Sequence, residues 1–157
     1  MQDRHITPSQ LALFSRSPVI GAWWEEVHAT DPDRAPRPAT KALDQLLYDA
    51  GLKHEEVLVK RLRDEGNTVT KLEGKQRDSD YEATLDAMRS GADYIWQASL
   101  HNNELRGSAD LLERIEQPSK LGNWSYIPIE CKLSSHPKPI YLVQACAYCE
   151  LLTPILG

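Results

Sequence analysis

Apolar residues recur at spacings of three and four between residues 41 and 65, which is the period of an amphipathic helix. The residues that make this pattern are Leu43, Leu46, Leu47, Ala50, Val57, Leu58 and Leu62. Gly66 and Asn67 follow the last of them, and residues of these types commonly end helices. The pattern therefore predicts a long helix from Lys41 to Glu65.

The middle of the chain alternates its residues in the manner of β-strands. Two sets interleave there, namely Tyr94, Trp96, Ala98, Leu100 and Ile95, Gln97, Ser99, His101. Asn102-Asn103 is a plausible tight turn before a return strand from Leu105 to Ile115. Further strands are expected at Thr68–Leu72 and Trp124–Leu133, and Pro128 indicates a bulge or a sheet edge in the latter.

Helices are predicted on either side of these strands. Thr7 and Gln10 have the spacing of a capping box around Pro8, which suits a first helical position. The other expected elements are a helical turn through Trp23, Trp24 and Val27, a proline-rich loop over Asp31–Ala39, a polar helix over Tyr81–Arg89 and a last helix over Ile140–Leu152. This order predicts an α/β fold with a mixed central sheet flanked by helices. We take residues 1–40 as an N-terminal helical arm and residues 41–157 as the core.

The composition is that of a folded globular protein. Of 157 residues, 41% are hydrophobic and 26% are charged, and 18 Lys and Arg against 23 Asp and Glu give a net charge of −5. No run of about 18 apolar residues indicates a membrane span, and the N-terminus lacks the apolar stretch of a signal peptide. We therefore expect a cytoplasmic protein that does not bind membranes. The odd number of cysteines, three, argues against a disulfide framework.

Two short segments carry candidate chemistry. In Ile129-Glu130-Cys131-Lys132, strand alternation places Glu130 and Lys132 on one face and Ile129, Cys131 and Leu133 on the core face. A weak surface ion pair is the alternative interpretation of this segment. In Gly107-Ser108-Ala109-Asp110, an aspartate follows small residues that allow another group to approach closely. An aspartate at a bulge or sheet edge is the alternative there.

Taken together, Asp110 and the later Glu130-Cys131-Lys132 resemble the PD-(D/E)XK nuclease superfamily. Ala109 stands where a proline commonly precedes the aspartate. Gly51-Leu52-Lys53-His54 is similar to the Gly-x-x-His motif of the RecB-like branch, and Gln144 and Tyr148 are spaced as in its Gln-x-x-x-Tyr motif. The four motifs occur in order over residues 51–152.

This resemblance implies a restriction-endonuclease-like core and a nuclease that hydrolyses DNA with Mg²⁺ or Mn²⁺. Asp110, Glu130 and Lys132 would be catalytic. The metal ligands would be His54, Asp110, Glu130 and the backbone carbonyl of Cys131, with Glu55 as the fallback ligand. The helix pattern supports His54, because it lies four residues after Ala50 and on the apolar face. Gln144 and Tyr148 would bind DNA or orient the site.

The resemblance also implies partners and excludes one cofactor. Single-stranded or open-ended DNA is the expected substrate, and a helicase domain or a partner protein is expected because local cations are few. No iron–sulfur cluster is expected, because Ser17 stands at the matching N-terminal position and Cys146-x-x-Cys149 supplies only two thiolates. Cys146 and Cys149 are instead expected to be buried apolar residues.

Two other functions remain open from the sequence. One is a catalytically inactive nucleic-acid-binding module that retains the nuclease fold. The other is an interaction domain that does not touch DNA. The combination of Asp110, Glu130 and Lys132 favours the nuclease, because clustered carboxylates repel one another and a scaffold does not need them.

Overall fold

The structure is a computed structural model that describes residues 5–31, 34, 42–75 and 78–157. Most of the expected loop over 31–39 therefore lies outside the described residues. In chain order the elements are α1 (Pro8–Arg16), α2 (Pro18–Thr30), α3 (Ala42–Asp64), β1 (Val69–Lys71), α4 (Asp78–Arg89), β2 (Tyr94–His101), β3 (Arg106–Ile115), β4 (Ser125–Ile129) and α5 (Pro139–Leu156).

Within the described ranges, the four strands form one open sheet in the order β1-β2-β3-β4. β1 runs parallel to β2, and the other two pairs are antiparallel, so the predicted mixed sheet is confirmed. β4 is an edge strand, which explains how Pro128 is accommodated opposite Leu112. β4 ends at Ile129, earlier than the predicted end at Leu133, so Glu130 and Lys132 follow the strand and do not belong to it.

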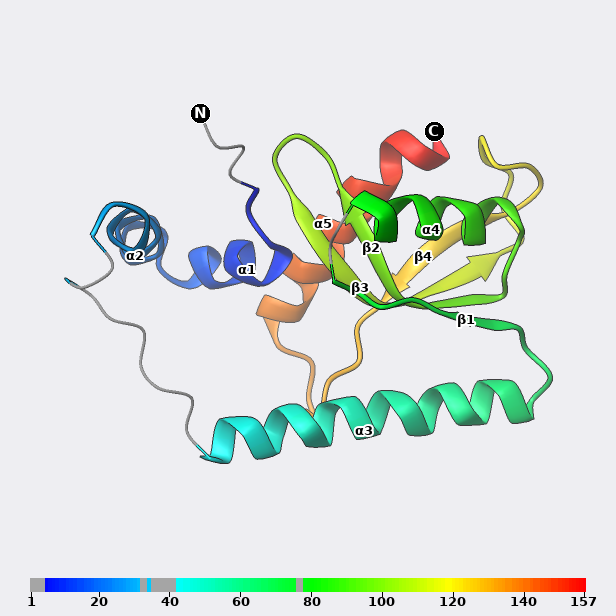
Figure 1. The fold of residues 1–157 in the computed structure, drawn as a ribbon, viewed down its shortest axis with the longest axis horizontal. Helices are drawn as coiled ribbons and strands as arrows, with labels where there is room; N and C mark the ends of the chain where they lie inside the picture. The colour runs from blue at the N-terminus through cyan, green and yellow to red at the C-terminus, as the bar shows by residue number, and fades with distance from the viewer. Residues whose placement is uncertain (1–4, 32–33, 35–41, 76–77) are drawn as a thin grey trace.

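Two apolar clusters lie on different sides of the sheet. The larger one joins β2, β3 and β4 to α4 and α5, and it includes the fully buried Met88, Ile95 and Leu112. The smaller one joins α3 to the sheet through Val59, Leu62, Trp96 and Leu111. Figure 1 shows α3 below the strands, whereas α4 and α5 lie away from it beside the sheet. The sheet is therefore flanked by helices, as the sequence predicts.

Local sequence signals set the ends of several helices. Thr7 Oγ1 accepts a hydrogen bond from Gln10 N, and Thr7 N donates to Gln10 Oε1, so the predicted capping box is present. α3 ends where Gly66 adopts a φ of +92° and Asn67 N donates to Leu62 O. The N-terminal segment adds to the sheet, because Ile6 N donates to Glu104 O and Arg106 N donates to Ile6 O. α1 then packs on α5.

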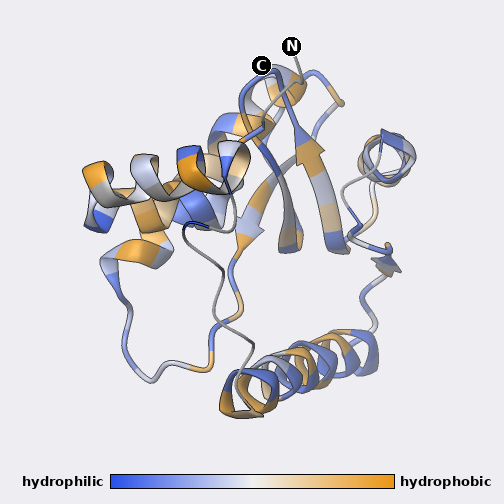
Figure 2. Ribbon diagram, turned by 60° about the vertical axis from the view of Figure 1, so that its left-hand side comes forward, coloured by the Kyte–Doolittle hydropathy of each residue, from blue (hydrophilic) through white to orange (hydrophobic). Residues whose placement is uncertain are grey.

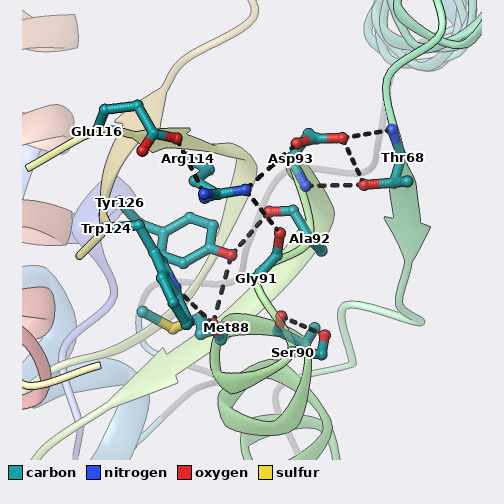
Figure 3. A network of polar contacts seen from close by, with 11 residues as sticks. Thr68, Met88, Ser90, Gly91, Ala92, Asp93, Arg114, Glu116, Trp124 and Tyr126 are labelled. Carbon is teal, nitrogen blue, oxygen red and sulfur yellow. Dashed lines mark hydrogen bonds and ion pairs between the residues drawn. The ribbon is translucent and has the colours of Figure 1, made fainter. Parts of the chain in front are cut away.

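A polar network holds the junction between α4, β1 and β2 (Figure 3). Asp93 Oδ2 accepts hydrogen bonds from both Thr68 N and Thr68 Oγ1, which ties the start of β1 to the start of β2. Tyr126 Oη donates to Ala92 O at 2.7 Å, and Trp124 Nε1 donates to Met88 O at 3.1 Å. These two side chains thus satisfy one carbonyl group in the last turn of α4 and one in the segment between α4 and β2.

Only the C-terminal part of the apolar stripe that predicts α3 faces the sheet, where Leu58 and Leu62 pack in the smaller cluster. Leu43, Leu46 and Leu47 are each more than half exposed, as is Val57. The buried residues of α3 are Glu55, Val59 and Leu62, with spacings of four and three, and of these only Leu62 belongs to the predicted stripe. Figure 2 shows apolar positions along α3, which lies apart from the other helices. The apolar period therefore predicts the helix correctly, but most of the apolar positions that make the pattern lie outside its inward face.

α5 is long and apolar enough to cross a membrane when only its length and composition are considered. From the sequence we expected no segment with the length and apolar composition of a membrane span, and α5 meets both conditions. In the fold, Ala147, Tyr148, Leu151 and Leu152 are buried in the core, which accounts for part of the apolar character of α5. Leu142 is exposed on the same helix. A single helix of this kind is weak evidence for membrane insertion, because core helices pass the same test.

Candidate functional site

Three charged side chains meet beside the end of β4. Lys132 Nζ lies 2.7 Å from Glu130 Oε2 and 3.7 Å from Asp110 Oδ2. Asp110 belongs to β3, and the register that pairs Leu111 with Ile129 brings it next to the residues that follow β4. The backbone N–H of Cys131 donates to Asp110 Oδ2 at 2.8 Å and fixes this arrangement. Glu130 and Lys132 share a side as alternation predicts, whereas Leu133 is exposed and does not enter the core.

Glu55 of α3 is the third carboxylate of this cluster. Its Oε2 atom accepts hydrogen bonds from Trp96 Nε1 at 3.0 Å and Gln97 Nε2 at 2.7 Å. The negative charge of Asp110 acts on Glu55, and that of Glu55 acts on Glu130, so the three carboxylates are electrostatically coupled. The three carboxylates therefore come from different parts of the chain: Glu55 from α3, Asp110 from β3 and Glu130 from the segment after β4.

The expectation that His54 points inward is wrong, because His54 is exposed. It lines a shallow surface hollow with Val57, Leu58 and Arg61. Successive residues on a helix are about 100° apart, so burial of Glu55 turns His54 away from the carboxylates. Glu55, which the resemblance implies only as a fallback ligand, is the α3 residue that lies in the cluster.

Burial sets the electrostatics of the cluster. It raises the pKa values of Glu55, Asp110 and Glu130 above their ordinary values, against the opposing positive charge of Lys132. Burial lowers the pKa of Lys132, but the contacts with Glu130 and Asp110 outweigh it, so the pKa of Lys132 is raised. Buried Glu130 Oε2 receives the ammonium as an ion pair without hydrogen-bond geometry. The cluster thus holds more negative than positive charge in a partly desolvated place.

Gln97 has the backbone conformation that sets this geometry. Its φ is +60°, which is uncommon for a residue other than glycine. Gln97 lies where the register of β2 and β3 is interrupted, between the pairs Trp96–Leu111 and Ala98–Ala109. The regular alternation predicted for β2 breaks here, because Ile95 and Ala98 belong to the larger core cluster while Trp96 belongs to the smaller one. Consecutive residues Trp96 and Gln97 can therefore both donate to Glu55. An amide within an apolar strand was the only sequence signal for this role.

The two residues of the Gln-x-x-x-Tyr motif have different surroundings. Tyr148 is buried, and its hydroxyl donates to Ser108 O at 2.6 Å, two residues before Asp110. Gln144 Nε2 donates to Ser9 Oγ at 2.9 Å and so joins α5 to α1. A Cβ at Gly107 would lie 2.6 Å from Pro8 Cδ, so this glycine admits α1 and not an external group. Tyr148 thus supports the strand that carries Asp110.

The three cysteines do not form a metal site together. Cys146 and Cys149 are both exposed on α5, so the expectation that they are buried is wrong. Cys131 is half-buried, and burial raises the pKa of its thiol to about 12, with added repulsion from Asp110. Its thiol stays protonated at neutral pH, which leaves the backbone groups of Cys131 as its contribution to the site.

The ligand set is incomplete in the geometry of this structure. Among the described residues, no group of three or more His, Cys, Asp or Glu side chains has the spacing to hold a metal ion. Lys132 Nζ lies against two of the three carboxylates, those of Asp110 and Glu130. The chain matches no protein-family model, no curated protein and no solved structure. The chemistry of these residues is therefore the main basis for a functional assignment.

Proposed function

We propose that this chain is a divalent-metal-dependent deoxyribonuclease with a restriction-endonuclease-like core of the RecB-like kind. The observation that carries the proposal is the meeting of Glu55, Asp110 and Glu130 with one ammonium, that of Lys132. Buried like charges destabilise a fold, and such groups are characteristic of functional sites. The four-motif resemblance supplies the reaction class.

The donor set suits Mg²⁺ or Mn²⁺. Glu55, Asp110, Glu130 and the Cys131 carbonyl are all oxygen ligands, which these cations prefer. The desolvated carboxylates, with raised pKa values, would gain from a divalent cation that relieves their repulsion. When bound, the metal would polarise the scissile phosphate and lower the pKa of water. His54 is left out of this proposed set because it is exposed.

The chain's own residues would complete the hydrolysis. Lys132 Nζ would donate to a nonbridging phosphate oxygen and stabilise the negative charge that develops there. A water oxygen forms the new bond to phosphorus while the bond to the leaving oxygen breaks, and the water proton ends on that oxygen. Two contacts would hold Asp110 in place. The Cys131 N–H donates directly to the Asp110 carboxylate, and the Tyr148 hydroxyl donates to Ser108 O on the same strand.

A cleavage assay tests this function. A labelled single strand and an open-ended duplex are incubated with Mn²⁺ or Mg²⁺, and we expect cleavage that EDTA stops. Lys132→Ala should lower the rate by at least about 100-fold, because a charge-stabilising donor is lost. Lys138→Ala is the matched control, since both ammonium groups lie 5.8 Å from the Tyr141 ring centroid. Equal cleavage by wild type and Lys132→Ala would mean that a contaminant cuts the DNA.

One observation favours a second function, an inactive nucleic-acid-binding module. Lys132 already neutralises part of the charge of Asp110 and Glu130, as it would where no cation binds. This alternative predicts salt-dependent binding of DNA with no cleavage in any divalent metal. The same assay, with binding measured by fluorescence anisotropy, separates the two functions.

A further inference from the structure

A cavity of about 520 Å³ opens between α3, β2 and the segment that follows β1. This volume falls within the usual range for small-ligand sites. Apolar and aromatic side chains supply much of its wall, including Tyr48, Leu52, Leu72 and Trp96. Tyr48 is 63% exposed, so its ring is accessible to a ligand. The cavity therefore offers an aromatic surface that the fold itself does not cover.

The charges around the cavity balance one another. Lys75 Nζ lies 2.6 Å from Glu73 Oε2, and Lys71 Nζ lies 4.3 Å from the centroid of the Trp96 ring. Glu56 supplies a second carboxylate to the wall. Two ammonium groups and two carboxylates leave no excess positive charge to attract a phosphate. An uncharged aromatic group fits this lining better.

The cavity and the carboxylate cluster share two wall residues. Trp96 and Gln97 both line the cavity, and both donate hydrogen bonds to Glu55 Oε2. On α3, Leu52 and Glu56 of the cavity wall lie on either side of Glu55 in the sequence. A polymer that reaches the carboxylates could therefore place its neighbouring unit in the cavity.

We propose that this cavity binds one nucleobase of a single-stranded nucleic acid, stacked on Tyr48, beside the carboxylate cluster. The inference rests on the proposed function for its choice of ligand. Every base has an aromatic face, so the stacking selects for an unpaired strand without selecting its sequence. A paired base is already stacked in a duplex, and the cavity therefore favours single strands over duplexes.

The test measures binding without cleavage. Fluorescence anisotropy of a labelled oligothymidylate is recorded in EDTA at low salt, up to protein concentrations that detect weak binding. Tyr48→Ala should weaken binding roughly tenfold, and Tyr48→Phe should restore it, because stacking needs the ring and not the hydroxyl. Leu43→Ala is the matched control, since Leu43 is on the same helix and equally exposed at 63%. Circular dichroism confirms that each variant is folded.

A second oligonucleotide separates base binding from phosphate binding. With abasic sites in place of its bases, wild type and Tyr48→Ala should bind with the same reduced affinity. An undiminished Tyr48 effect on the abasic strand would overturn the inference, as would equal binding of thymidylate by wild type and Tyr48→Ala, or no binding at all. Metal-dependent cleavage that survives Tyr48→Ala with unchanged binding would remove this inference and leave the nuclease standing. Tyr48-dependent binding without cleavage would remove the nuclease and leave the base-binding cavity standing.

Discussion

Glu55 and His54 are adjacent on α3, but only Glu55 faces the sheet and contacts Trp96 and Gln97. This pair allows a direct comparison of two candidate ligands. Glu55→Gln should abolish Mn²⁺ binding or weaken it strongly, because one of three carboxylates is lost, whereas His54→Gln should bind Mn²⁺ as wild type does. Isothermal titration calorimetry measures both. Loss of binding in His54→Gln alone would restore the histidine as ligand.

The Gln97 backbone gives a second prediction at this scale. A side chain at positive φ costs about 1 kcal/mol or more relative to glycine, and Gln97 has a φ of +60°. Gln97→Gly should therefore be more stable than Gln97→Ala by about 1 kcal/mol, measured by urea denaturation. Both variants lose the hydrogen bond to Glu55, so that loss cancels in the comparison. In an ordinary strand alanine is the more stable of the two, and that order would contradict the strain.

At the scale of elements, local signals predicted the chain well. The capping box at Thr7, the end of α3 at Gly66 and the edge position of Pro128 each depend on neighbouring residues or on one missing N–H group. Which residues of α3 face inward depends instead on distant residues, namely Trp96 and Leu111 of the sheet against which Val59 and Leu62 pack. Leu43 and Val57 are exposed whereas Leu62 is buried against the sheet, so only part of the apolar stripe lies on the inward side. Sequence period alone does not settle such a choice.

The site, likewise, is predictable from the sequence only where it depends on regular strand geometry. Strand alternation predicts that Glu130 and Lys132 share a face, and the resemblance adds Asp110 to them. The structure brings the three together through the pairing of β3 with β4. The role of Gln97 was not predicted, because strict alternation was assumed along β2. A single residue at positive φ reverses the faces of the residues beyond it. That event is a property of the backbone and leaves little trace in the sequence.

The link between β1 and β2 depends on an ionised aspartate. Hydrogen bonds from the Thr68 hydroxyl and amide lower the pKa of Asp93 below its ordinary value of 3.8. A lowered folded-state pKa adds stability above the unfolded pKa, and this stability is lost as the pH falls through the folded value. Asp93→Asn should therefore lower Tm at neutral pH, and its difference from wild type should shrink below about pH 4. A difference that is constant with pH would contradict this role.

For the whole molecule, the carboxylates of the proposed metal site lower the stability of the fold. Burial raises the pKa values of Glu55, Asp110 and Glu130, so their ionisation destabilises the fold as the pH rises through those values. A bound cation removes this cost. Mn²⁺ should raise Tm by the equivalent of about 2.7 kcal/mol at 100 times its dissociation constant, and less as the pH falls toward the raised pKa values. Differential scanning fluorimetry measures this, and Asp110→Asn should abolish the Mn²⁺ effect.

Crystals soaked in Mn²⁺ test the central claim most directly, because anomalous scattering locates the ion. We predict one ion bonded to carboxylate oxygens of Glu55, Asp110 and Glu130, with Lys132 moved off the shared place and His54 distant from it. Carboxylates that stay paired with Lys132 and leave the ion elsewhere, or at His54, would contradict the account.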